Sequence, residues 1–80
     1  MDKKQISNVV KAILNITGTS RQDIALALGK KPQGLSDQLQ RGSFNAVDLI
    51  TIAERCGAHL AFVDSNGKAI VTFPALESQE

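Results

Sequence analysis

Hydrophobic residues recur three and four positions apart over residues 6–17, which is the spacing of one buried stripe on an amphipathic helix. Gly18 is expected to end this helix. A second helix should follow Ser20, whose side chain can cap the first turn, and a third should begin at Pro32, which suits a first helical position. Gly42 is placed to end the third helix. The pattern therefore predicts three helices in the first half of the chain.

The segment that joins the second and third helices has the residue spacing that is most specific for one structural motif. Ala25 is small enough to let the next helix approach closely, and Gly29 can adopt the left-handed conformation that reverses the chain. Leu35 is placed one turn into the third helix, where it fills the gap between the two. This is the chemistry of a helix-turn-helix, whose second helix can lie in the major groove of DNA. An ordinary helical corner is the alternative that the spacing alone leaves open.

A fourth helix is expected from Ala46 to about Cys56, with Asn45 as its cap. Its apolar positions extend around much of its circumference: Ala46, Val47, Leu49, Ile50, Ile52, Ala53 and Cys56. A helix with so wide an apolar surface is covered on more than one side. We therefore expect an element other than the first three helices to pack on it.

The hydrophobic period changes after the fourth helix. Residues 58–64 and 69–73 predict two β-strands, joined through Asn66 and Gly67, a pair that suits a tight type I′ turn. A two-residue turn would pair Val63 with Ile70 and Phe62 with Val71. The C-terminal part of the chain is therefore predicted to form a β-hairpin.

Both faces of this hairpin are apolar. One carries Leu60, Phe62, Val71 and Phe73, and the other carries Ala61, Val63, Ile70 and Thr72. A lone two-stranded hairpin is marginal in water and has two open edges. We expect one face to cover the fourth helix and the other, or an edge, to meet a second copy of the chain. The candidate dimer interface is Leu60, Phe62, Val63, Ile70, Val71 and Phe73.

The length and composition of the chain limit the classes of protein to which it can belong. The 80 residues suit one domain with a small core, and no apolar run approaches the ~18 residues that a membrane span needs. Cys56 is the single cysteine and has no partner for a disulfide within the chain, which fits a reducing, cytoplasmic setting. The formal net charge is only +1, which is mild for a protein that binds nucleic acid.

No residue pattern predicts an enzyme. The sequence has no Ser-His-Asp arrangement, no paired carboxylates and no phosphate-binding loop, and Cys56 with His59 offers too few ligands for zinc. We interpret Cys56 as a core thiol. No cofactor and no small-molecule ligand are expected.

Residues 6–57 resemble the phage-repressor (Cro-type, xenobiotic-response-element) helix-turn-helix family, and especially small bacterial members whose four helices continue into a C-terminal hairpin. The matching positions are Ser20-Arg21 at the opening of the second helix, Ala25, Gly29, and the buried Leu35 and Leu39. The resemblance implies a mostly α-helical, four-helix, repressor-like domain that binds double-stranded DNA as a homodimer. Residues 1–57 would form the helix-turn-helix part, residues 58–74 the hairpin of the same domain, and residues 75–80 a flexible tail.

Candidate contact residues lie on and around the third helix. The side opposite Leu35 and Leu39 presents the candidate base contacts Gln33, Ser36, Asp37 and Gln40. Gln33 is the best reader, because its amide can both accept from and donate to adenine. Candidate phosphate contacts are Arg21, Gln22, Lys30, Lys31 and Arg41. A solvated polar face is the alternative for these side chains.

Two classes of function follow. The first is a sequence-specific, homodimeric transcriptional regulator, such as a repressor, in the cytoplasm at the nucleoid. The alternative is a protein-interaction module, an antitoxin-like or adaptor subunit, that keeps the fold and has lost DNA binding. The low net charge, Gly34 in the third helix and the acidic Asp37 favour the alternative. The regulator is favoured by five residues on one side of the corner: Arg21, Lys30, Lys31, Gln33 and Arg41.

Overall fold

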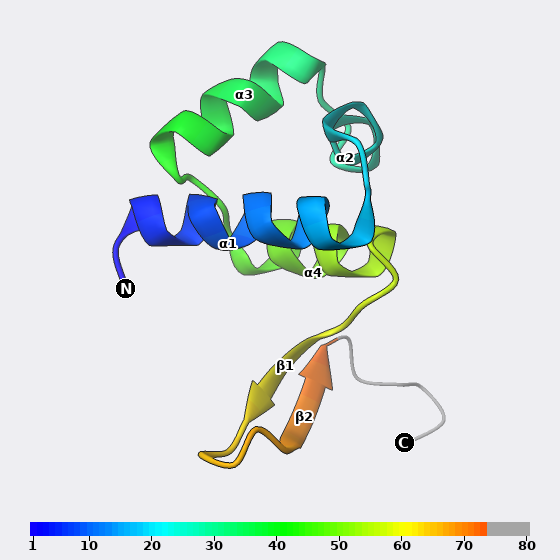
Figure 1. The fold of residues 1–80 in the computed structure, drawn as a ribbon. Coiled ribbons are helices and arrows are strands. Elements are labelled where there is room, and N and C mark those ends of the chain that lie inside the picture. The colour runs from blue at the N-terminus through cyan, green and yellow to red at the C-terminus, as the bar shows by residue number, and fades with distance from the viewer. Residues whose placement is uncertain (74–80) are drawn as a thin grey trace.

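Four α-helices and a two-stranded antiparallel sheet account for residues 1–73, the part of the chain that the computed structural model describes (Figure 1). The elements are α1 (Lys3–Thr17), α2 (Arg21–Ala27), α3 (Pro32–Arg41), α4 (Ala46–Arg55), β1 (Leu60–Val63) and β2 (Ala69–Phe73). The predicted mostly helical class with a C-terminal hairpin is confirmed. Pro74 and the tail expected at residues 75–80 lie outside the described residues. Within residues 1–73, no helix has both the length and the apolar character needed to cross a membrane.

Side-chain caps set where the helices begin. Ser20 accepts a hydrogen bond from the backbone of Asp23 at 3.1 Å, so α2 starts where the sequence predicted. Helix α1 begins earlier than expected, because Asp2 and Gln5 form a capping box ahead of the apolar stripe. Hydrophobic spacing reveals only the buried part of a helix, so it did not predict the exposed first turn of α1.

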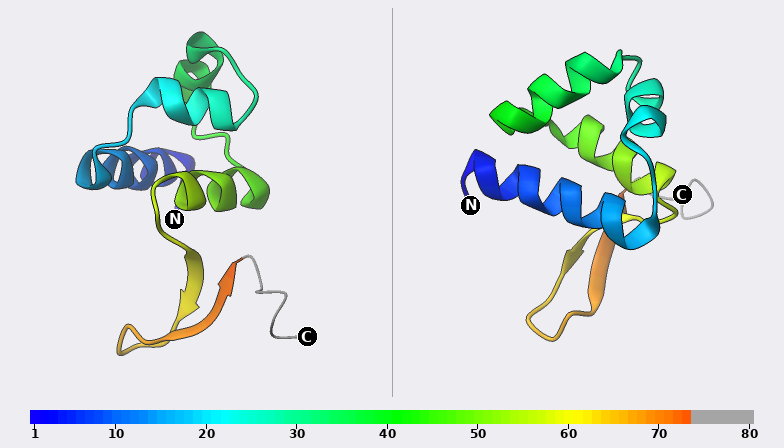
Figure 2. Two further views of the ribbon diagram at one scale, coloured as in Figure 1. Left: turned by 90° about the vertical axis from the view of Figure 1, so that its right-hand side faces the viewer. Right: turned by 45° about the horizontal axis from the view of Figure 1, so that its top comes forward.

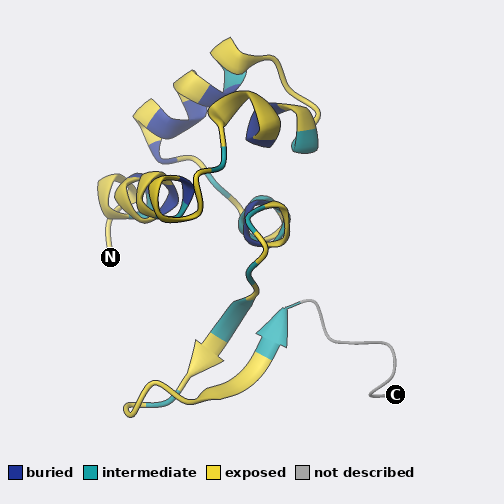
Figure 3. Ribbon diagram, turned by 45° about the vertical axis from the view of Figure 1, so that its right-hand side comes forward, coloured by how far each residue is buried: buried dark blue, intermediate teal, exposed yellow. Residues whose placement is uncertain are grey.

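The helices form two layers around one small core. Helices α1 and α4 lie side by side, and α2 and α3 lie over them (Figures 1 and 2). The dark blue, buried parts of the ribbon face the space between the layers in Figure 3. The core consists of Val10, Leu14, Ile24, Ala25, Leu35, Leu39 and Ile52. Every helix therefore contributes at least one fully buried hydrophobic side chain, which fixes α3 relative to the rest.

The C-terminal end of α3 approaches the N-terminal end of α1 very closely. Gly42, which ends α3 as predicted, is buried and has a φ of 65°. A Cβ atom at this position would lie 2.1 Å from the carbonyl oxygen of Lys3. The hydroxyl of Ser7 on α1 also donates to the carbonyl of Leu39 on α3. Both the backbone conformation and the space therefore require glycine at residue 42.

The hairpin differs from the sequence prediction in its turn and register. Phe62 pairs with Val71 as expected, but Val63 pairs with Ala69, and a bulge separates the two pairs. The predicted pairing of Val63 with Ile70 is therefore wrong. The strand β1 also begins at Leu60, not at residue 58.

The side chain of Asp64 explains the altered register. Its Oδ1 accepts hydrogen bonds from the backbone of Asn66 at 2.9 Å and of Lys68 at 3.0 Å. Gly67 has a φ of 84°, whereas Asn66 does not have a positive φ, so the turn is not type I′. The Gly67 N–H donates to the Asp64 carbonyl, and the Asp64 N–H donates to Lys68, which closes a three-residue loop. An aspartate that stabilises its own turn overrides the asparagine–glycine preference.

The hairpin projects from the helical layers on the side opposite α3 (Figures 1 and 2). Strand β1 contacts α4, and Leu60 at its base is half-buried. Farther out, Phe62, Val63, Ile70 and Val71 are exposed, as the yellow ribbon of Figure 3 shows. The expectation that one face of the hairpin covers α4 is therefore wrong. The chain leaves α4 through a left-handed Gly57 and extends outward, so only the base of the hairpin packs.

Candidate nucleic-acid interface

Helix α3 has one buried face and one exposed face. Leu35, Gln38 and Leu39 are buried. All four candidate base contacts are exposed: Gln33, Ser36, Asp37 and Gln40. We call these four residues the outer face of α3. In Figure 1, α3 lies at the edge of the molecule with no described element above it. The division between the two faces follows the sequence prediction.

The turn before α3 fixes how the helix leaves α2. Gly29 has a φ of 70°, and the N–H of Lys30 donates to the carbonyl of Ala25 at 2.8 Å. Lys31 is extended, with a ψ of 157°, as a residue before proline prefers. Pro32 then occupies the first turn of α3. Ile24 and Ala25 are fully buried, so α2 holds the start of α3 through the core contacts that the spacing predicted.

Two residues of the outer face are linked to each other. The Nε2 of Gln33 donates to the Oδ1 of Asp37 across one helical turn, at 3.2 Å. The amide of Gln33 keeps its second N–H and its carbonyl oxygen free for an outside partner. Those two groups are the ones that a bidentate contact with adenine requires. Asp37 therefore orients the Gln33 side chain, which can still form hydrogen bonds with another molecule.

Gln38 holds the other end of α3, and the sequence analysis assigned it no role. It is 3% exposed, and its Nε2 donates to the Ser43 carbonyl and to Asp48 Oδ2, both at 2.9 Å. Asp48 also accepts from the backbone of Asn45, at 3.3 Å, within the capping box of α4. This network ties the C-terminal half of α3 to the start of α4. The position three residues after Leu35 was the available signal, since it lies on the buried face of the helix.

The candidate phosphate contacts are exposed, and three of them lie at the ends of α3 while two lie at the start of α2. Lys30 and Lys31 occupy the turn before α3, and Arg41 is in its last turn, while Arg21 and Gln22 begin α2. Within residues 1–73, the ion pair that forms joins Arg55 to Asp23, at 3.7 Å, and leaves those four cations without a carboxylate partner. They are therefore available to an external anion.

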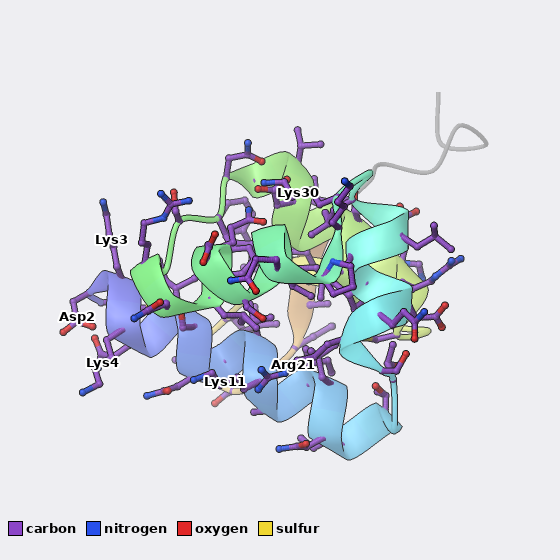
Figure 4. All side chains as sticks on the ribbon, turned by 90° about the horizontal axis from the view of Figure 1, so that it is seen from above. Asp2, Lys3, Lys4, Lys11, Arg21 and Lys30 are labelled. Atoms are coloured by element: carbon purple, nitrogen blue, oxygen red, sulfur yellow. The ribbon has the colours of Figure 1, made fainter. Side chains whose placement is uncertain are left out.

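Charge is distributed unevenly along the chain. Residues 1–42 hold seven Lys or Arg against three Asp or Glu, whereas residues 43–80 hold two against five. The excess of cations thus belongs to α1, α2, α3 and their links. Viewed onto α3, the labelled Lys3, Lys11, Arg21 and Lys30 lie around its outline (Figure 4). The sequence analysis did not include Lys3 or Lys11 among the candidate contacts, because their place beside α3 depends on the packing of α1.

Cys56 and His59 lie apart from the outer face of α3. Cys56 is a free thiol that packs against the core from the end of α4, as interpreted, and His59 is exposed. Among the described residues, no three His, Cys, Asp or Glu side chains come together as a metal-binding group.

No protein-family model matches the chain, and comparisons with curated proteins and with solved structures also gave no match.

Proposed function

We propose that this chain is a helix-turn-helix protein that binds double-stranded DNA sequence-specifically as a homodimer and regulates transcription. The observation that carries the proposal is the outer face of α3, where four exposed polar side chains lie between cations at both ends of the helix. The ten residues of α3 span roughly 15 Å. With its side chains an α-helix is about 10–12 Å across, so α3 fits the major groove, which is about 12 Å wide.

Each side chain of the outer face has a chemistry that a base edge can use. Gln33 is the reader of adenine, because Asp37 orients its amide and leaves one N–H and the carbonyl oxygen free. Asp37 accepts hydrogen bonds only, so it favours the exposed amino group of cytosine and disfavours guanine. Ser36 and Gln40 can each donate or accept. Sequence preference therefore depends mainly on Gln33 and Asp37.

The cations around α3 supply affinity that does not depend on sequence. Arg21, Lys30, Lys31 and Arg41 neutralise phosphates on either side of the groove, and Gln22 adds an amide donor. Each neutralised phosphate contributes roughly 0.9 to the slope of log affinity against log salt. The low net charge of the chain is compatible with phosphate binding around α3, because the acidic residues lie mainly in the second half of the chain.

Fluorescence anisotropy with a labelled random-sequence duplex, titrated from low to physiological salt, tests the proposal. We expect binding that weakens steeply with salt, followed by enrichment of one sequence when sites are selected from a random duplex library. Lys68→Ala, in the hairpin turn far from α3, is the control for a change of one charge. Absence of binding at low salt would refute DNA binding and leave the protein-interaction module as the function.

A further inference from the structure

Two lysines of α1 lie on the edge of that helix that adjoins α3. Lys4 precedes Ser7 by three residues, and Lys11 follows it by four, and residues at these spacings share one face of a helix. The Ser7 hydroxyl donates to the carbonyl of Leu39 on α3, so this face is turned toward α3. Ser7 is buried by that contact, whereas Lys4 and Lys11 are exposed on either side of it.

The stability of α1 does not account for these charges. The helix contains three lysines and no acidic residue, and Lys3 and Lys4 occupy its first turn, the positive end of the helix dipole, where a cation is unfavourable. Asp2, which precedes them, uses its carboxylate as the helix cap and accepts from the backbone of Gln5 at 2.9 Å. In the part of the chain that the structure describes, neither Lys4 nor Lys11 forms an ion pair. Both lysines are therefore free to meet an anion on another molecule.

The cations around α3 form two groups on opposite sides of the helix. In Figure 4, Lys11 and Arg21 lie on one side of α3, and Lys30 lies on the other. Lys4 continues the first group toward the N-terminal end of α1. We call Lys4, Lys11 and Arg21 the basic flank. A helix in the major groove has one phosphate strand on each side, so the two groups correspond to the two strands.

We propose that the basic flank binds the phosphates of one DNA strand, while Lys30, on the other side of α3, binds the opposite strand. The inference rests on the proposed function and extends its DNA interface from α2 and α3 onto α1. Lys4 and Lys11 are seven residues apart, roughly 10 Å along the helix, and the charges of one strand recur about every 3.4 Å along the duplex axis. The two lysines therefore reach different phosphates of the same strand.

Two amide side chains complete the same edge of α1. Asn8 lies four residues after Lys4, and Asn15 lies four residues after Lys11, so each amide neighbours a lysine on the helix surface. Both amides are exposed and can donate to phosphate oxygens. The edge thus offers only cations and amides, with no carboxylate and no hydrophobic side chain. Such a surface suits a phosphate backbone better than another protein, because the centre of a protein–protein interface is poor in charged residues.

The salt dependence of duplex binding by full-length variants tests the basic flank. Lys11→Ala should lower the slope of log affinity against log salt by roughly 0.9 per monomer. Asn15→Lys, which adds a charge one turn farther along the same edge, should raise the slope by a similar amount, a gain that misfolding cannot produce. Ile16→Lys adds the same charge at an 80% exposed neighbour, about 100° around the helix, and should change the slope much less. Equal slopes for the two lysine variants would refute the flank, whereas a wild-type chain that does not bind duplex would refute the proposed function itself.

Phosphate-ethylation interference on the selected duplex assigns the two strands. Ethylation removes the charge of one phosphate, so it weakens binding only where the protein uses that charge. We expect Lys11→Ala to lose interference at a phosphate on one strand of the site, and Lys30→Ala to lose it at a phosphate on the opposite strand. Loss on the same strand for both variants would overturn the two-strand arrangement. An interference pattern of Lys11→Ala identical to that of the wild type would remove α1 from the interface and leave DNA binding through α3 intact.

Discussion

Alanine at Gly42 should destabilise the fold far more than alanine at other glycines, because this residue touches α1. The positive φ of 65° costs alanine about 1–2 kcal/mol. In addition, its Cβ would lie 2.1 Å from the Lys3 carbonyl oxygen, so the ends of α1 and α3 must separate. Overpacking of this kind costs about 1–3 kcal/mol. We expect a total loss of about 2–5 kcal/mol for Gly42→Ala, against a typical stability of roughly 4–12 kcal/mol for a domain of this length.

Alanine substitutions at two other glycines separate the cost of the positive φ from the cost of the close contact with α1. Gly18 has a φ of 70°, and a Cβ at this residue would have no atom within 4 Å, so Gly18→Ala should lose only the conformational part, about 1–2 kcal/mol. Gly34 lies inside α3, where a Cβ would meet Lys30 at an ordinary 3.6 Å. Gly34→Ala should therefore stabilise the protein by about 0.5–1 kcal/mol.

Urea unfolding followed by far-UV circular dichroism measures all three free energies. The expected order is Gly34→Ala above the wild type, Gly18→Ala below it, and Gly42→Ala lowest. A Gly42→Ala protein within about 0.5 kcal/mol of Gly18→Ala would refute the close approach of α1 and α3. The position of α3 would then need another explanation.

Three further substitutions address the outer face of α3 and its support. Gln33→Ala should weaken the preferred DNA site by about 1–3 kcal/mol in anisotropy and leave non-specific binding nearly unchanged; unchanged discrimination would remove it as a reader. Lys31→Ala should lower the slope of log affinity against log salt by roughly 0.9 per monomer, whereas Lys68→Ala should not. Gln38→Ala should lower the free energy of unfolding, measured in urea, by about 1–3 kcal/mol, because it removes the side-chain donor from two partly buried acceptors. An effect as small as that of Gln40→Ala, at an exposed residue of the same helix, would contradict the hydrogen-bond network between Gln38, Ser43 and Asp48.

Local chemistry made the helices and their faces predictable. Ser20 and Pro32 mark the starts of two helices whatever lies around them, since each acts on its own first turn. Leu35 and Leu39 define the buried face of α3, so the exposed residues opposite them followed from helical spacing alone. The outer face of α3 was predictable for this reason.

Other features were not predictable in this way, because they depend on competing local hydrogen bonds or on contacts between distant segments. The register of the hairpin depends on how Asp64 bonds to its own turn, and this competes with a strong asparagine–glycine preference. Whether the hairpin covers α4 depends on the direction in which the chain leaves Gly57, which no periodicity encodes. The role of Gln38 appears only when α4 places Asp48 beside it.

The most direct test of DNA binding through α3 is a titration of isotope-labelled protein with the selected duplex, followed by backbone amide chemical shifts. The largest changes are expected at Gln33, Ser36, Asp37 and Gln40 and at the turn that contains Lys30, with small changes in the hairpin. Changes confined to the hairpin, or none at DNA concentrations that saturate a micromolar site, would contradict the assignment of α3 as the helix that enters the major groove.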